Sequence, residues 1–160
     1  YDLGQAAGDL SITAQTIDKD TTLNAPTPGA WSHGTFNGWY TDTNLTQPWR
    51  TGPVSSNTTL HAKWTRNTYT VTIDQNGGTG APTSLSVTDG QAIGTLMTTK
   101  PGHHLTGWVR TSDHTTWNPD TDPVHAPMTI KAKWEADQYT VRFLAPGLTP
   151  NPTITDQTGI

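Results

Sequence analysis

Hydrophobic and polar residues alternate along several short segments of this chain. In residues 69–73 (Tyr-Thr-Val-Thr-Ile) the apolar side chains share one face and the threonines the other, and residues 130–134 (Ile-Lys-Ala-Lys-Trp) alternate in the same way. A period of two is typical of half-buried β-strands, because successive side chains of a strand point to opposite faces. The patterns at 85–88 and 105–109 predict two further strands.

Turn residues separate these strands and leave little room for helix. The segment 76–80 (Asn-Gly-Gly-Thr-Gly) follows the first strand, and Asn and Gly accept the positive φ angles of tight turns. Residues 91–99 have room for one short helical turn, which a glycine interrupts. The predicted fold class is therefore mainly β (α+β at most), with about four strands in each small unit and little or no helix.

The strand pattern occurs twice along the chain, which identifies an internal repeat. Residues 59–64 (Thr-Leu-His-Ala-Lys-Trp) recur 70 positions later as Thr-Ile-Lys-Ala-Lys-Trp, and residues 36–39 (Phe-Asn-Gly-Trp) recur 69 positions later as Leu-Thr-Gly-Trp. Three further landmarks keep the same order: residues 10–13 with 85–88, 28–29 with 101–102, and 53–54 with 123–124. Five ordered matches make coincidence a poor explanation.

These landmarks divide the chain into three parts. Residues 1–64 form a unit that lacks its opening strand apart from Tyr1, residues 65–134 form a complete unit, and residues 135–160 start a third, truncated unit. The third start is identified by residues 139–143 (Tyr-Thr-Val-Arg-Phe), which resemble 69–73. The connecting segments are short and contain no Gly or Pro, so we expect closely spaced units in an extended, stiff array of which this chain is an excerpt.

Composition changes this picture in three ways. Only 31% of the residues are hydrophobic, but seven are tryptophans, and one large ring buries as much apolar surface as several small side chains. The net charge of −4 without a Lys/Arg cluster argues against nucleic-acid binding, and no apolar run is long enough for membrane insertion. The lack of cysteine excludes disulfides, thiolate zinc sites and a thiol nucleophile.

The ordered motifs resemble the Listeria–Bacteroides repeat, the family of the B-repeat of internalin B and of many Gram-positive surface proteins. The residues that carry the resemblance are the opening strand at 69–73, the Asn-Gly-Gly turn, the Gly-Trp pairs and the closing Ala-Lys-Trp strands. The resemblance implies small tandem β-grasp-like units of the ubiquitin/SUMO shape. It also implies a place between a ligand-binding or catalytic part and a wall anchor, and it supplies no catalytic residues.

Four tryptophans recur at equivalent positions and are predicted to be structural core. Two belong to the Gly-Trp pairs and two end the closing strands: Trp39, Trp108, Trp64 and Trp134. Their apolar neighbours favour packing over sugar stacking.

The other three tryptophans are the candidate ligand contacts. Trp49 and Trp117 lie in polar segments near prolines, and Trp31 occurs in only one copy, so we expect Trp31 to be the most exposed ring. Exposed aromatic rings in loops often mark binding sites.

The remaining polar residues predict no metal, cofactor or catalytic site. His103 and His104 could share a metal with His114 or His125, but adjacent histidines on a strand point to opposite faces, which favours a surface role. The Asp-x-Asp pairs at 18–20 and 120–122 lack the glycine and distal glutamate of a calcium loop. The only glutamate lies in a connecting segment, and no Gly-x-Ser-x-Gly elbow is present.

Two functional hypotheses follow. The first is a non-catalytic stalk or spacer segment of a secreted or cell-wall-attached bacterial surface protein, which presents an adhesive or enzymatic head. The second is a module that binds a host glycan or protein through exposed tryptophans. Both place the chain outside the cell, on the surface of a Gram-positive-type bacterium, with neighbouring repeats as its nearest partners.

Overall fold

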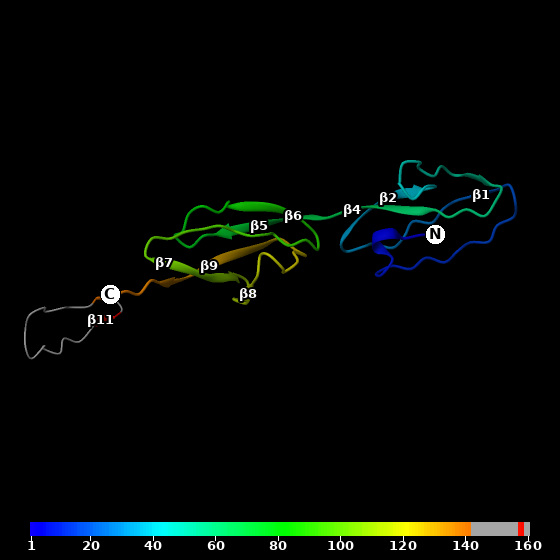
Figure 1. Ribbon diagram of the computed structural model, residues 1–160. Coiled ribbons are helices and arrows are strands. Elements are labelled where there is room, and N and C mark those ends of the chain that lie inside the picture. The colour runs from blue at the N-terminus through cyan, green and yellow to red at the C-terminus, as the bar shows by residue number, and fades with distance from the viewer. Residues whose placement is uncertain (142–156, 159–160) are drawn as a thin grey trace, which may run out of the picture. The chain divides into compact units, whose positions relative to one another are not determined.

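The computed structural model describes residues 1–141 and 157–158 and divides the chain into two compact units. Unit 1 comprises Tyr1–Tyr69 together with two later segments, Val87–Gln91 and Val124–Ala126; unit 2 comprises the remainder. Most strands of both are labelled in Figure 1. The prediction of a mainly β fold is confirmed, because the described residues contain strands and a single 3₁₀ turn, η1 (Gly4–Ala6). Among these residues no helix is long and apolar enough to cross a membrane.

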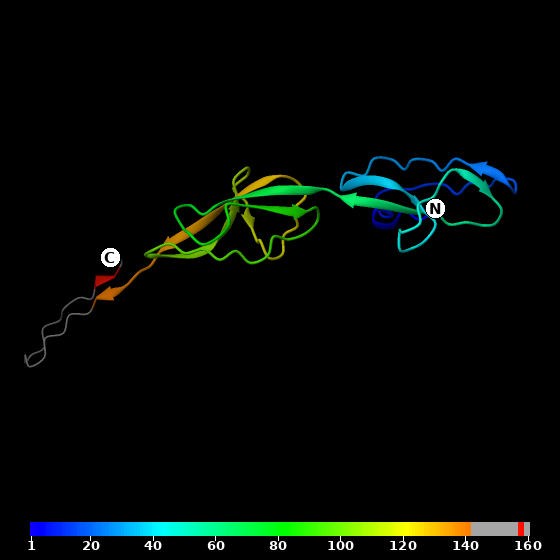
Figure 2. The ribbon, with the colours of Figure 1, turned by 90° about the horizontal axis from the view of Figure 1, so that it is seen from above.

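Unit 2 contains most of a five-stranded mixed sheet. Its order is β6 (Ser84–Thr88), β5 (Thr68–Asp74), β9 (Met128–Ala136), β7 (His103–Arg110) and β8 (Thr116–Trp117). The first and last long strands, β5 and β9, are parallel neighbours at the centre, and β7 pairs antiparallel with β9. Figures 1 and 2 show these strands side by side from two directions.

Two details of unit 2 differ from the sequence-based prediction. About four strands were expected, and the fifth is the two-residue strand β8, too short to show a period of two. Residues 91–99 contain no helical turn, although Leu96 within them is buried. The β-grasp-like comparison remains a prediction.

The alternating side chains of β5 and β9 form the core of unit 2. Val71 and Ile130 are fully buried, Ile73 and Ala132 nearly so, while the threonines between them on β5 are exposed. Burial of one face of each strand is what the period of two predicts.

Unit 1 contains two antiparallel pairs. β2 (Gly34–Tyr40) pairs with β4 (His61–Arg66), and β1 (Thr21–Leu23) pairs with β3 (Gly52–Val54). A cluster of buried apolar side chains lies between η1, β2 and β4: Leu3, Ala6, Trp31, Trp39, Leu60, Ala62 and Trp64.

The first residues of unit 1 occupy the place that β5 has in unit 2. Asp2 forms a parallel bridge with His61, with Asp2 N donating to Leu60 O and Ala62 N donating to Asp2 O, both at 2.8 Å. The unit was predicted to lack its opening strand apart from Tyr1, and the structure shows one bridge of such a strand.

The repeated Gly-Trp pair is a β-bulge in both units. The register shifts between Phe36 and Gly38 in the β2–β4 pair and between Leu105 and Gly107 in the β7–β9 pair. Gly38 has a φ of 116° and Gly107 a φ of 146°, conformations that a side chain disfavours. The extra residue of a bulge re-aims the side chain that follows, and here both following tryptophans point into the core.

The predicted third unit, residues 135–160, lies largely outside the described residues. Within it, β10 (Thr140–Val141) pairs antiparallel with β11 (Gln157–Thr158).

Candidate functional site

The four tryptophans assigned to the core have structural surroundings. Trp39, Trp64 and Trp108 are buried, and Trp134 is half-buried. The closing-strand rings also donate equivalent hydrogen bonds, Trp64 Nε1 to Leu3 O at 3.0 Å and Trp134 Nε1 to the carbonyl oxygen of Gln75 at 2.9 Å. Each bond ties the closing strand to the chain just after the opening strand of its unit.

The expectation that Trp31 is exposed is wrong. Trp31 is only 6% exposed, its Nε1 donates to Asp9 Oδ2 at 2.6 Å, and its ring meets the Trp64 ring edge-on. The Arg66 guanidinium covers it with its carbon 5.3 Å from the ring centroid. The sequence offered no sign of this burial, because Trp31 has no counterpart in the second copy.

The expected exposure of Trp117 is also wrong, and that of Trp49 only partly holds. Trp117 is 7% exposed and pairs with Trp108 across β7 and β8, while Trp49 is half-buried and donates its backbone N–H to Trp39 O. In the described part of the chain, neither indole N–H has a hydrogen-bond partner. The structure therefore does not present these three rings as an open binding face.

A different group of polar side chains meets in unit 1: His33, Asp89 and His125. His33 lies in the turn before β2, Asp89 directly follows β6, and His125 lies in the segment before β9. All three belong to unit 1, since the segments around Asp89 and His125 are part of it.

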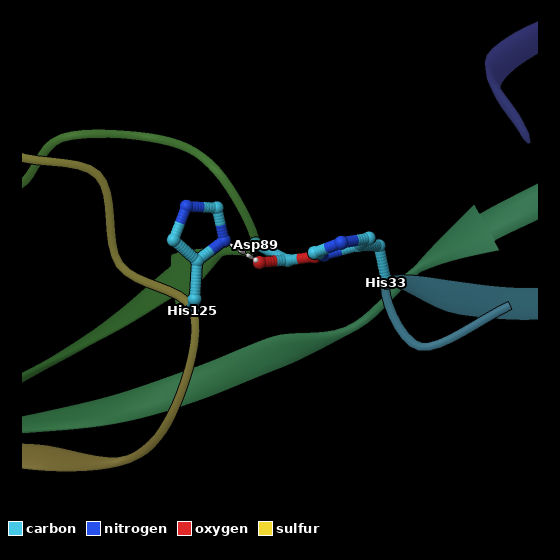
Figure 3. A group of neighbouring side chains, drawn as sticks. All are labelled: His33, Asp89 and His125. Carbon is cyan, nitrogen blue, oxygen red and sulfur yellow. Dashed lines mark hydrogen bonds and ion pairs between the residues drawn. The ribbon is translucent and has the colours of Figure 1, made fainter. Parts of the chain in front are cut away.

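The carboxylate of Asp89 is the centre of this group. Its Oδ2 lies 2.5 Å from His33 Nδ1 and its Oδ1 lies 2.7 Å from His125 Nδ1, so each oxygen faces one imidazole (Figure 3). The two rings meet edge-on with centroids 5.5 Å apart. Asp89 is fully buried, whereas the side chain of His33 is 35% exposed and that of His125 is 53% exposed.

Burial and hydrogen bonding shift the pKa of the Asp89 carboxyl group in opposite directions. Burial alone would raise the pKa of its carboxyl group, but the hydrogen bonds and positive charge offered by His125 and His33 outweigh it, so the pKa lies below its ordinary value. Arg66 contacts the main chain of Asp89 and not its carboxylate, since its Nη1 donates to the Asp89 carbonyl oxygen at 3.1 Å. Asp89 is therefore an ionised carboxylate that depends on its two imidazole partners.

Sequence reasoning missed this group, because its members are 56 and 36 positions apart and belong to no shared motif. His103 and His104, which the sequence analysis grouped with His114 or His125, do not share a site with either in the described residues. His103 Nδ1 faces Pro101 O at 2.9 Å and His104 Nδ1 faces Asp137 Oδ1 at 2.9 Å, while His125 faces Asp89 instead.

A surface cleft of 540 Å³ lies elsewhere in unit 1. Its walls combine the Tyr1 ring and Leu23 with a run of polar residues at 55–59. Tyr1 Oη donates to Gln15 Oε1 at 2.6 Å, and burial raises the pKa of this phenol. The cleft contains no pair of acidic or histidine side chains and offers no evident chemistry.

Comparison with known proteins identifies the family. Residues 4–63 and 69–133 both match the Listeria-Bacteroides repeat domain. These two matches cover most of the chain, which therefore belongs to the Listeria-Bacteroides repeat family.

Two relatives come from Evansella cellulosilytica. One, provisionally named a Gly-rich membrane protein, is 32% identical over an alignment of 150 residues that covers 89% of this chain and 17% of the relative. The other, provisionally named a membrane protein, is 34% identical over an alignment of 124 residues that covers 76% of this chain and 19% of the relative. The chain thus spans less than a fifth of either relative, and no solved structure matches it significantly.

Proposed function

We propose that the chain is a non-catalytic spacer segment of a secreted or cell-wall-attached bacterial surface protein, where it presents an adhesive or enzymatic head. The observation that carries the proposal is the tandem match of residues 4–63 and 69–133 to one repeat family. Tandem repeats of small folded units are a common way to add length to a protein, because each unit contributes its own increment.

The structure of each unit supports this role. The large aromatic side chains serve internal packing and tie opening and closing strands together, as shown by the Trp64 and Trp134 hydrogen bonds. The relatives from Evansella cellulosilytica carry membrane-protein names and are more than five times longer than the matched region, which leaves room for a head and an anchor.

The alternative, a module that binds a host glycan or protein through exposed tryptophans, has less support. It relied on Trp31, Trp49 and Trp117, and two of these rings are more than nine-tenths buried. Protein surfaces that bind sugars by stacking need a ring face open to solvent.

Small-angle X-ray scattering on the 160-residue chain tests the spacer proposal. A compact particle of this length has a radius of gyration of about 15 Å, and an unfolded chain about 42 Å. A spacer requires an intermediate value with an elongated pair-distance distribution and the circular dichroism of folded β-structure. A value near that of the compact particle would overturn the proposal. Saturable glycan binding on an array, lost on substitution of Trp49, would favour the alternative.

A further inference from the structure

We propose that His33, Asp89 and His125 form a binding site for a divalent transition-metal ion of the Zn²⁺ type. The three side chains offer two imidazole nitrogens and one carboxylate oxygen, and these atoms all lie within 4.8 Å of one another. Zn²⁺ accepts this combination, and sites with three protein ligands keep the fourth position for water or another ligand.

The backbone of the site is fixed independently of the three side chains. Asn67 N donates to His33 O at 3.0 Å, and Asp89 N donates to Asn67 O at 2.8 Å, so one residue holds both ligands' main chains. Gly90 N donates to Val124 O at 2.8 Å, which places the residue before His125 beside the residue after Asp89. Ligands on a fixed backbone lose little conformational entropy when an ion binds.

The buried carboxylate of Asp89 favours the binding of a cation. Its side chain is fully buried, and within residues 1–141 its only ion-pair partners are the two imidazoles. An uncompensated buried carboxylate is strongly unfavourable, and a neutral imidazole compensates it only through a hydrogen bond. A divalent ion between carboxylate and imidazoles would add to the positive charge that the imidazoles offer.

The geometry accommodates an ion after a small movement. The two Nδ1–Oδ separations are 2.5 and 2.7 Å, while the ligand atoms of a tetrahedral zinc site lie about 3.3 Å apart. Each imidazole nitrogen must therefore move away from the carboxylate oxygen that it faces by less than about 1 Å. The side chains of His33 and His125 are 35% and 53% exposed, so part of each borders solvent.

Two other histidine–carboxylate contacts provide matched controls. His61 Nδ1 lies 2.9 Å from Asp2 Oδ2, and His104 Nδ1 lies 2.9 Å from Asp137 Oδ1. Each contains one imidazole where the proposed site has two. The carboxylates are partly exposed instead of buried.

Isothermal titration of ZnCl₂ into the chelator-treated 160-residue chain tests the proposal. We expect one equivalent of Zn²⁺ to bind, with each ligating imidazole carrying its ring proton on Nε2. The variants His33→Gln and His125→Gln should each weaken binding by about tenfold or more, and His61→Gln and His104→Gln should leave it unchanged. Glutamine retains an N–H donor for the carboxylate that each histidine faces, so circular dichroism should show all four variants folded.

Visible absorption of the Co²⁺-loaded chain gives a second readout that needs no variant. A tetrahedral nitrogen–oxygen spectrum that Zn²⁺ abolishes supports the site. The proposal is overturned if no one-to-one binding occurs up to about 1 mM Zn²⁺, an affinity too weak for a built site. It is equally overturned if His33→Gln and His125→Gln bind as the parent chain does, or no more weakly than the two control variants.

Discussion

Asp74 faces Lys131 across the parallel strands β5 and β9, with Oδ2 3.2 Å from Nζ. In unit 1 the equivalent contact joins Asp2 and His61, whose Oδ2 and Nδ1 lie 2.9 Å apart across the short parallel bridge. The two repeats thus place an aspartate at the end of the opening strand and a basic residue on the closing strand.

The Asp74 contact predicts a specific loss of stability in acid. The backbone hydrogen bond from Asn76 and the bond and charge of Lys131 lower the pKa of Asp74 against the opposing effect of burial, with the Asn76 bond the largest cause. A carboxylate with a lowered folded-state pKa stabilises the fold above its ordinary value of 3.8, and this stabilisation is lost as the pH falls through the lowered pKa. Asp74→Asn should therefore cost about 0.5–1 kcal/mol at neutral pH and almost nothing near pH 2, measured by urea unfolding.

Lys131→Met separates the two contributions to this pKa. It removes the exposed ion pair but keeps the larger contribution, the hydrogen bond from Asn76 N at 2.8 Å. The variant should keep most of the acid dependence of the parent chain. If Lys131→Met lost as much of the acid dependence as Asp74→Asn, the Asn76 hydrogen bond would not be the larger cause of the lowered pKa.

The bulge at Gly38 predicts a large loss of stability from a small substitution. Gly38 has a φ of 116°, and a Cβ there would contact nothing within 4 Å, so backbone conformation alone requires glycine. Gly38→Ala should destabilise unit 1 by about 1–3 kcal/mol, measured by chemical denaturation followed by tryptophan fluorescence.

Gly8→Ala is the matched control for the bulge. A Cβ at Gly8 also meets open space, but Gly8 has no positive φ. The control should lie within about 0.5 kcal/mol of the parent chain. Similar effects of both substitutions would show that the bulge is not strained by a side chain.

The repeat landmarks explain how much of the fold was predictable. Residues 130–134 and 69–73 could be placed because their burial follows a period of two, and the Gly-Trp pairs because they recur. Strand β8 was missed because two residues carry no period. Trp31 was misplaced because its burial depends on Asp9 and Arg66, which are distant in sequence.

The His33–Asp89–His125 group was beyond sequence reasoning for a different reason. Residues 10–13 correspond to 85–88, so the next residue of the first copy, Ala14, stands where the second copy has Asp89. The group therefore does not recur between the copies, and comparison of the repeats could not reveal it. Only the folded backbone, through Asn67 and Val124, brings its members together.

Because Trp31 is buried, its substitution should lower the stability of the fold whether or not the chain binds a ligand. Trp31→Ala should destabilise the chain by about 3–5 kcal/mol, because it removes a buried ring and leaves a cavity. Ile17→Ala, at a position 37% exposed in the same unit, should cost far less. Unchanged thermal stability of Trp31→Ala would restore the interpretation of Trp31 as an exposed ligand contact.

Two buried indole rings, those of Trp64 and Trp117, differ in one hydrogen bond. Trp64 Nε1 donates to Leu3 O, whereas Trp117 Nε1 has no partner among the described residues, although the exposed fractions of the two rings are 9% and 7%. Substitution by phenylalanine removes similar ring volume at both positions, so the difference reports the hydrogen bond. Trp64→Phe should therefore lose about 0.5–1.5 kcal/mol more than Trp117→Phe in the free energy of unfolding.

Trp134→Phe extends the comparison to the second copy, because its Nε1 donates to Gln75 O as Trp64 Nε1 does to Leu3 O. If both closing-strand rings hold the chain after the opening strand, hydrogen exchange of the Gly78 amide, bonded to Gln75 O, should accelerate in Trp134→Phe. In Trp117→Phe this amide should exchange at the parent rate. Equal acceleration in both variants would assign the effect to lost ring volume and remove the hydrogen bond as the reason for the repeated Ala-Lys-Trp ending.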